Sequence, residues 1–258
     1  MMKIDSYGIT DIGRKRQKNE DSFFVNKTIN VFIVADGMGG HAAGEKASIC
    51  AVETINQFME HTQAEEEITW PFGFDANLNF IENRIKAAIH LAHRKILDAS
   101  SEDYNLKGMA TTVVVTAVIQ DKLYIGHVGD SRAYLIRDNK IIQLTTDHSW
   151  VNEQLRSGII NAQQAKSHPF KNVVTRALGG PQDLEVDLIN EQLMVGDFIL
   201  LCSDGLTSMI EDKDLLDLVG KNKENLETAS KKLIETANSK GGNDNITIVL
   251  VHLVNTEQ

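Results

Sequence analysis

Aspartates recur at the ends of apolar segments in this sequence, where a carboxylate has few ways to find a partner. There are five of them: Asp21, Asp36, Asp130, Asp204 and Asp244. Burying an unpaired carboxylate beside runs such as VFIVA or FILLCS costs several kcal/mol. Brought together without a counter-charge, the five would repel one another and be driven to protonate. Divalent cations resolve this conflict, and ligation by oxygen alone suits Mg²⁺ or Mn²⁺.

A pair of such cations would give the site a hydrolytic chemistry. A carboxylate shared by two ions about 3.5–4 Å apart supports a bridging hydroxide and clamps a phosphoryl group. Taken singly, an Asp beside Gly is more often a turn former or a helix cap. Five at strand ends, each close to Gly or Asn, favour the metal site if the fold brings them together.

Short segments rich in Val and Ile, punctuated by Gly, Asp and Asn, predict many strands. The expected strands are 3–10, 21–26, 30–35, 111–119, 122–127, 132–137, 184–190, 197–202 and 245–254. Several of them are separated only by tight turns, at 120–121 and 138–139, which favours antiparallel hairpins.

Helices are expected in two blocks that interrupt the strands. The first block is 42–60 followed by 77–100, and the second is 213–219 followed by 224–239. In 77–100 the apolar residues repeat at helical spacing: Leu78, Ile81, Ile85, Ile89, Ala92 and Ile96. This order predicts an α+β fold of two stacked antiparallel sheets, each covered on its outer side by a pair of helices.

The segment 147–181 differs from its surroundings. It contains two short helical pieces, at 150–157 and 162–167, together with two prolines and paired glycines. We interpret it as an excursion from the sheets that could lie beside a site as a lid. Because the chain has no repeat, low-complexity tract or linker, we expect one domain over 1–258.

The composition excludes several classes of protein. A formal net charge of −10, from 36 acidic and 26 basic residues, makes a poor binder of nucleic acid or anionic membranes. The N-terminus does not resemble a signal peptide, and the longest apolar runs are shorter than a membrane span of roughly 20 residues. Cys50 and Cys202 stand in apolar stretches, as reduced core residues do. We therefore expect a cytoplasmic monomer without nucleic-acid or membrane partners.

Seven short motifs stand in order along the chain. They are RQKNED (16–21), VADGMGGH (34–41), GMATT (108–112), GDSR (129–132), LTTDH (144–148), SDG (203–205) and DNIT (244–247). Each alone is weak, but together they resemble the protein phosphatase 2C family, the metal-dependent PPM phosphatases, in its bacterial form. The resemblance implies an α-β-β-α sandwich, which agrees with the elements expected above. It also identifies 147–181 with the family's variable flap.

The resemblance implies roles for the residues of the metal pair. Asp36 would bridge the two ions, and the carbonyl group of Gly37 would bind one of them. Asp204 and Asp244 would hold one ion. The ions would be Mn²⁺ or Mg²⁺, and the attacking group would be the bridging water or hydroxide.

Further roles follow from the same resemblance. Asp21, together with Glu20, would hold the other ion, partly through water. Asp130, with Asp204, would hold the third, weaker ion that some relatives have. Arg16 would grip the substrate phosphate through its guanidinium fork.

One position departs from the family pattern. Animal members often carry His directly after the Asp-Gly pair, as the proposed general acid for the leaving alkoxide, and this chain has Met38 there. His41 follows three residues later, and nothing in the sequence gives it that role. The general acid is therefore unassigned.

Other features have simpler explanations. The stretch 37–42 fits Gly-x-Gly-x-x-Ala, but the carboxylate directly before it would repel a dinucleotide pyrophosphate. His90 and His93 are interpreted as a solvated helix flank, and His127 as a structural histidine. Ser203 lies outside any Gly-x-Ser-x-Gly or Ser-x-x-Lys motif, which disfavours a serine nucleophile.

The resulting hypothesis is hydrolysis of phosphoserine and phosphothreonine on proteins, without a covalent intermediate. Family habit suggests as substrates a bacterial serine/threonine kinase and its targets, or a phosphorylated regulator. Two alternatives stay open: a non-catalytic phosphoprotein-binding regulator, and a hydrolase of small phosphoesters. The complete acidic set disfavours the regulator, and comparing rates on phosphopeptides and nucleotides would separate the hydrolases.

Overall fold

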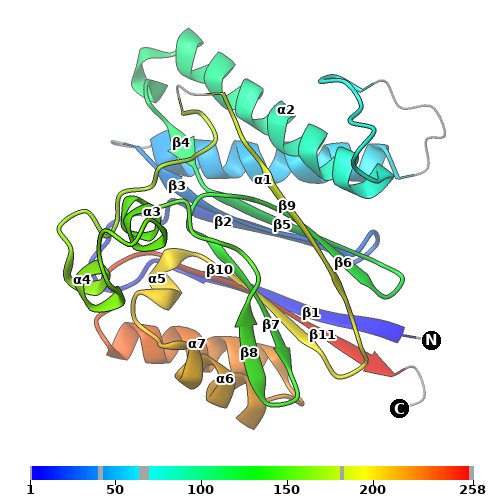
Figure 1. The fold of residues 1–258 in the computed structure, drawn as a ribbon, viewed down its shortest axis with the longest axis vertical. Helices are drawn as coiled ribbons and strands as arrows, with labels where there is room; N and C mark the ends of the chain where they lie inside the picture. Colours follow the sequence, from blue (N-terminus) through cyan, green and yellow to red (C-terminus); the bar gives the residue numbers. More distant parts are fainter. Residues whose placement is uncertain (1, 40–42, 64–69, 181–182, 256–258) are drawn as a thin grey trace.

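Two β-sheets stack face to face in the computed structural model, which describes residues 2–39, 43–63, 70–180 and 183–255. Helices cover the outer face of each sheet, so the layers run helix, sheet, sheet, helix (Figure 1). The expected α+β sandwich of four layers is confirmed.

The first sheet has five strands in the order β1-β11-β10-β7-β8, and every neighbouring pair is antiparallel. Its strands are β1 (Met2–Asp11), β7 (Arg132–Arg137), β8 (Lys140–Gln143), β10 (Phe198–Cys202) and β11 (Ile246–Asn255). The first and last strands are therefore neighbours, and they bring loops from both ends of the chain together.

The second sheet has its strands in the order β2-β3-β5-β6-β9, and a short β4 pairs with β3. The strands are β2 (Asp21–Asn26), β3 (Val31–Met38), β4 (Ala110–Thr111), β5 (Val113–Ile119), β6 (Lys122–Val128) and β9 (Asp187–Gln192). These pairs are antiparallel too. The strands expected from local composition are thus joined by hairpins and by longer connections.

Four long helices form the outer layers. α1 (Ala43–His61) and α2 (Phe80–Glu102) cover the second sheet, and α6 (Asp212–Lys221) and α7 (Leu226–Ser239) cover the first. Two shorter elements are η1 (Tyr104–Leu106) and α5 (Asp204–Thr207). In the described part of the chain, no helix combines the length and the hydropathy needed to cross a membrane.

The interior follows from the alternation of side chains along each strand. In β11, Val249 and Val251 point between the two sheets, whereas Ile248 and Leu250 point toward α6 and α7. β3 divides its side chains in the same way between the inter-sheet core and the helices α1 and α2. The two sheets therefore share one interior.

The segment expected as an excursion, 147–181, falls between β8 and β9 in the chain. Its described part, residues 147–180, is called the flap below; it contains α3 (Trp150–Arg156) and α4 (Ala162–Ser167). Figure 1 shows both short helices beside the end of the sandwich that carries α5. The two arms of the flap are joined where Trp150 N donates to Val173 O at 2.9 Å.

Several boundaries differ from expectation for local reasons. α2 begins at Phe80 rather than at 77, because Asn79 and Glu82 form a reciprocal capping box. β9 begins at Asp187 rather than at 184, because its partner β6 ends at Val128 and Asp187 already faces His127. The edge strand β8 was not expected, since its four residues alternate between exposed and half-buried without a clear apolar run.

Candidate metal centre

The strands that carry the five aspartates end at one edge of the sandwich. β2 and β3 pair so that Asp21 faces Asp36. In the other sheet Cys202 of β10 pairs with Arg132 of β7 and with Ile248 of β11, so these strand ends lie side by side. The remaining aspartates flank those ends: Asp130, Asp204 and Asp244. We call these five residues the acidic rim.

Asp36 lies at the centre of the negative charge. Burial raises the pKa of its carboxyl group well above the ordinary value, and the charges of Asp21, Asp204, Asp130 and Asp244 raise it further. Burial raises the pKa of Asp204, and interaction with the Asp36 carboxyl group lowers it in part, as expected for neighbouring groups. Because Coulombic effects fall off with distance, four carboxylates acting on one group means that all five are gathered in a small volume.

Three more members of the acidic rim also have raised pKa values. Burial raises the pKa of Asp21 to about 7, and the charge of Asp204 adds to this. Burial also raises the pKa of Asp130 to about 7, again with help from Asp204. The pKa of Asp204 rises to about 6 through burial and then through the charge of Asp244. The folded chain therefore concentrates like charge that its own residues do not neutralise.

Among the described residues, one arginine forms an ion pair with the acidic rim. Arg16 Nη2 donates to Asp244 Oδ2 at 2.6 Å, and the Arg16 side chain is 49% exposed. This pair offsets one carboxylate of the five. Two buried oxygens nearby, Oδ1 of Asp21 and Oε1 of Glu20, have no hydrogen-bond partner among the described residues.

The donor set of the acidic rim fits hard divalent cations. It offers carboxylate oxygens, which are the ligands that Mg²⁺ and Mn²⁺ prefer. Cations held there would relieve the mutual repulsion and give the orphaned oxygens a partner. The backbone at Gly37 is also tightly packed, since an added Cβ would lie 2.1 Å from the Gly44 carbonyl oxygen and 2.5 Å from that of Glu20.

Two polar residues that sequence reasoning gave no supporting role hold this edge together. The first is Asn245, whose Nδ2 donates to the carbonyl groups of Ile12 and Lys18 at 3.0 and 2.9 Å. Its Oδ1 accepts from Glu20 N at 2.8 Å. Asn245 thus fastens the loop that carries Arg16 to the start of β11. Its place in the DNIT motif was the available signal.

The second is Ser203, which the sequence suggested only as an unsuitable nucleophile. Its hydroxyl group donates to Asp21 Oδ2 at 2.7 Å and accepts from Thr247 N at 3.0 Å. It therefore orients one carboxylate of the acidic rim and ties the two sheets together. Nothing local distinguishes this serine from a turn residue, because its partners are far away in the sequence.

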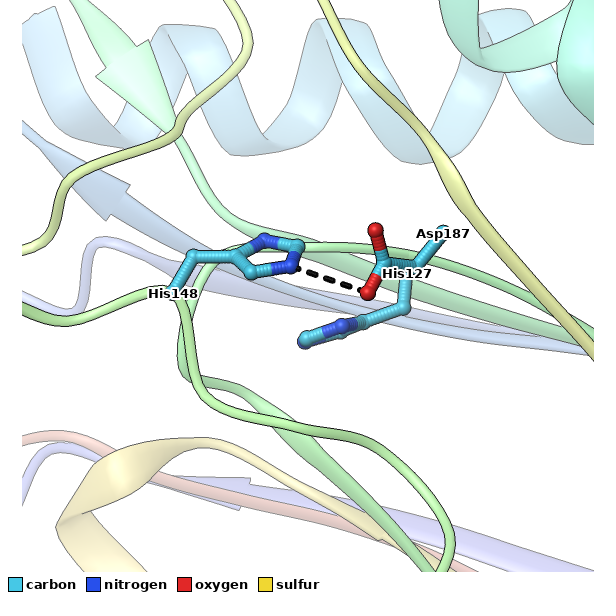
Figure 2. Close-up of side chains that lie close together, drawn as sticks. All are labelled: His127, His148 and Asp187. Atoms are coloured by element: carbon cyan, nitrogen blue, oxygen red, sulfur yellow. Dashed lines mark hydrogen bonds and ion pairs between the residues drawn. The ribbon is translucent and has the colours of Figure 1, made fainter. Parts of the chain in front are cut away.

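A second polar group lies where the flap meets β6 and β9. His127, His148 and Asp187 place ligand-type atoms within 4.8 Å of one another, as Figure 2 shows. Nε2 of His148 lies 3.2 Å from Asp187 Oδ2, and the two imidazole rings have centroids 4.8 Å apart. We call these three residues the histidine cluster. The sequence indicated a structural role for His127 but did not connect it with the other two.

The expectation that His90 and His93 form a solvated flank of α2 was wrong. Both residues are half-buried, and burial lowers the pKa of each. Nδ1 of His93 accepts from Gly179 N at 3.0 Å. His93 therefore fastens the end of the flap to α2.

A model of the family Protein phosphatase 2C matches residues 6–246, which is most of the chain. The chain belongs to the protein phosphatase 2C family. It is therefore an enzyme, a protein phosphatase, and the family and enzyme class expected from the seven motifs are confirmed.

Relatives of this protein phosphatase match it over nearly their whole length. The serine/threonine phosphatase stp of Listeria welshimeri is 40% identical over 249 residues, covering 94% of this chain and 93% of the relative. The protein phosphatase PhpP of Streptococcus pneumoniae is 36% identical over 250 residues, covering 95% and 96%.

Solved structures resemble this phosphatase equally closely. The Mycobacterium tuberculosis serine/threonine phosphatase PstP/Ppp superposes with a TM-score of 0.85 at 31% identity, over 98% of this chain and 99% of that one. A catalytic domain of PstP in complex with two manganese ions gives a TM-score of 0.84 at 30% identity, covering 99% and 100%. These likenesses agree with the four-layer fold.

The general acid of this phosphatase stays unassigned. Met38, at the position after the Asp-Gly pair, ends β3 and carries no proton that it could give to a leaving group. His41 lies outside the described residues.

Proposed function

We propose that this phosphatase hydrolyses phosphoserine and phosphothreonine in proteins with the help of Mn²⁺ or Mg²⁺. The observation that carries the proposal is the acidic rim: five carboxylates gathered at one edge, four of them with raised pKa values, beside orphaned buried oxygens of Asp21 and Glu20. Relatives named serine/threonine phosphatases, and a related structure with two manganese ions, support the substrate class and the metal.

Each member of the acidic rim has a proposed place in the metal centre. Asp36 would be shared by two cations, Asp204 and Asp244 would help to hold one of them, and Asp21 would help to hold the other. Asp130 serves, with Asp204, a third and weaker ion. The central position of Asp36 in the charge cluster supports its bridging role.

Backbone and neighbouring groups complete the proposed centre. The carbonyl group of Gly37 is a further ligand, and the packing that excludes any side chain at Gly37 supports a close backbone approach. Glu20, with its orphaned Oε1, assists Asp21. Bound there, the cations would activate a water molecule for in-line attack on phosphorus and offset charge on the phosphoryl oxygens.

Arg16 is proposed to bind the substrate phosphate. Its guanidinium group has five N–H donors, and Asp244 Oδ2 accepts from Nη2. The rest of the fork can face a phosphoryl group, since the side chain is half exposed at the acidic rim. Arg16 thus orients the substrate while it stays anchored to a metal ligand.

The proposed substrates are phosphorylated proteins, including a serine/threonine kinase or a phosphorylated regulator. The net charge of −10 disfavours nucleic acid. The interior shared by the two sheets supports one catalytic domain, with the flap as an excursion that influences substrate choice.

A substrate panel tests this function. Pure protein with Mn²⁺ is given phosphoserine, phosphothreonine and phosphotyrosine peptides, a nucleotide and p-nitrophenyl phosphate, each with an EDTA control. We expect the fastest turnover on the phosphoserine and phosphothreonine peptides, and none with EDTA. Faster hydrolysis of the nucleotide would instead indicate an enzyme of small phosphoesters, and absence of turnover with metal bound would indicate a binding protein.

The stereochemistry at phosphorus tests the mechanism separately. A thiophosphate monoester that carries two oxygen isotopes, hydrolysed in water of the third, gives chiral inorganic thiophosphate. Direct attack of water inverts the configuration at phosphorus, whereas a covalent phosphoenzyme gives retention through two inversions. We expect inversion. Retention would overturn the direct attack and leave the substrate class untouched.

A further inference from the structure

The histidine cluster lies at the junction between the flap and the loop that carries Asp130. His148 stands at the start of the flap, and Asp187 opens β9 directly opposite His127 of β6 (Figure 2). Gly129, the neighbour of Asp130, forms two hydrogen bonds with His148. Its N–H donates to the ring nitrogen Nδ1, and its carbonyl oxygen accepts from the backbone N–H of His148. These contacts connect a residue of the proposed metal centre with the flap.

The hydrogen bonds of His148 define its tautomer. Gly129 N donates to Nδ1 of His148 at 3.0 Å, so this nitrogen carries a lone pair. The proton of the neutral ring is then on Nε2, which points at Asp187 Oδ2 at 3.2 Å. Asp187 is held in turn by Arg176, whose Nη1 donates to Oδ1 at 3.2 Å. The ring is thus fixed at both nitrogens.

This arrangement disfavours a cation in the histidine cluster. A metal on Nε2 would need that nitrogen's lone pair, but Nδ1 already uses its own to accept from Gly129. Arg176 also brings positive charge to Asp187. His127 is fully buried, and burial lowers the pKa of its ring to about 4, so a neutral ring packs against His148. Neither nitrogen of that ring has a hydrogen-bond partner among the described residues.

Backbone bonds make His148 a node of three segments. Its N–H donates to Gly129 O at 2.8 Å, and its carbonyl oxygen accepts from Thr175 N at 2.8 Å. The preceding residue, Asp147, receives a fork from Arg132, with Nε–Oδ1 at 2.8 Å and Nη2–Oδ2 at 2.6 Å. The residues on both sides of Asp130 are therefore tied to the start of the flap, and His148 also reaches the flap's returning arm.

We propose that His148 is a positioning residue that fixes the Gly129–Asp130 loop against the flap, with its ring orientation set by Asp187. The proposal rests on the proposed role of Asp130 as a metal ligand. Residues that orient metal ligands contribute about 10–100-fold to metal affinity, so the hydrogen bond from Gly129 to the ring has a measurable consequence.

Two substitutions test the roles of the two ring nitrogens of His148 separately. His148→Asn keeps an acceptor near Nδ1 and loses the reach to Asp187, whereas His148→Gln keeps a donor near Nε2 and loses the acceptor for Gly129. We expect His148→Gln to weaken the weakest Mn²⁺-binding step about tenfold in calorimetric titration. His148→Asn should bind Mn²⁺ nearly as well as the unchanged protein. Equal affinities in the two variants would overturn the proposal.

A readout that needs neither activity nor a variant comes from nuclear magnetic resonance of the metal-free protein. We expect the ring of His148 to carry its proton on Nε2, and the amide hydrogen of Gly129 to exchange slowly with solvent. A proton on Nδ1 would overturn the proposal even where a variant fails to fold. In a folded His148→Gln protein the Gly129 amide should exchange faster.

Asp130→Asn distinguishes failure of this inference from failure of the proposed metal centre. If this variant binds every Mn²⁺ ion as tightly as the unchanged protein, the ligand role of Asp130 fails. The tautomer and the exchange of the Gly129 amide still decide whether His148 fixes the loop.

Discussion

The acidic rim and the histidine cluster are both partly buried groups of polar side chains, and they differ in how they are satisfied. In the acidic rim, carboxylates raise one another's pKa, and a buried oxygen of Asp21 has no partner among the described residues. In the histidine cluster, donors and acceptors alternate from Gly129 through His148 and Asp187 to Arg176. The third member, His127, has no partner for either ring nitrogen among the described residues, but burial keeps its ring neutral.

The difference between the acidic rim and the histidine cluster indicates which of them is a ligand-binding site. The hydrogen-bonded chain through His148 stabilises one arrangement of the backbone, and the unpaired ring of His127 adds no charge to it. A group of like charges is stable only when something neutralises it, whether a proton or a cation. The acidic rim is therefore a site for an external partner, and the histidine cluster is part of the support around it.

The largest expected effect comes from the centre of the acidic rim. Asp36→Asn should lower kcat/KM about a thousandfold or more, or ~4 kcal/mol of transition-state stabilisation, because it removes the proposed bridging ligand. Steady-state rates on a phosphothreonine peptide measure this, and circular dichroism checks the fold. The exposed Asp98→Asn is the matched control. Full activity of folded Asp36→Asn would end the bridging assignment.

Metal removal should reveal the repulsion in the acidic rim. The folded-state pKa values of about 7 for Asp21 and Asp130 lie above the ordinary value of about 3.9. Between about pH 4 and about pH 7 the folded chain then holds more protons than the unfolded chain, so stability without metal falls as the pH rises through this window.

Thermal unfolding in EDTA measures this effect. We expect a lower Tm at about pH 8 than at about pH 5. Mn²⁺ at a hundred times its Kd should restore about 2.7 kcal/mol per site at the higher pH. A metal-free Tm that rises with pH over the same window would contradict the picture of uncompensated carboxylates.

Arg16→Ala tests the only arginine paired with the acidic rim in the described structure. We expect KM for a phosphopeptide to rise about tenfold, the equivalent of one charge-assisted hydrogen bond, with kcat changed less. Mn²⁺ affinity should not fall, since the substitution frees Asp244. Exposed Lys15→Ala is the control. An unchanged KM would show that Arg16 does not bind the phosphate.

The smallest expected effect comes from comparing two buried serines, one with its hydroxyl group hydrogen-bonded and one without a partner for it. Ser203→Ala removes the hydroxyl that bonds Asp21 and Thr247, and should lower the free energy of unfolding by about 1–2 kcal/mol. Ser230 is also buried, but its hydroxyl has no partner among the described residues, so Ser230→Ala should cost less. Denaturant unfolding measures both. Equal losses would show that the bonds of Ser203 add no stability.

The sequence predicted most of the elements because they carry their own signals. The run of Val, Ile and Leu in β11 was visible, and this strand was expected at 245–254 and is seen at Ile246–Asn255. The helix α4 was expected at 162–167 and is seen at Ala162–Ser167. By contrast, the edge strand β8 was missed, because a short exposed strand is defined by its neighbour rather than by its composition.

The site was predictable only in part for a similar reason. Each aspartate was identified by its position beside an apolar strand, and the resemblance supplied its expected role. The supporting residues Ser203, Asn245 and His148 stand in three of the seven motifs, but nothing local indicated what each of them does. Asn245 binds Glu20 N, 225 residues away, and a partner at that distance is created by the fold alone.

The acidic rim draws on both layers of the sandwich, since Asp21 and Asp36 belong to one sheet and Asp204 and Asp244 flank strands of the other. Ions bound among them would connect the two sheets at this edge, so the sheets could separate there only after the metal had dissociated. The enzyme's resistance to mechanical pulling and to proteases would then follow the supply of divalent ions. Loss of divalent ions would then weaken the fold as well as the activity.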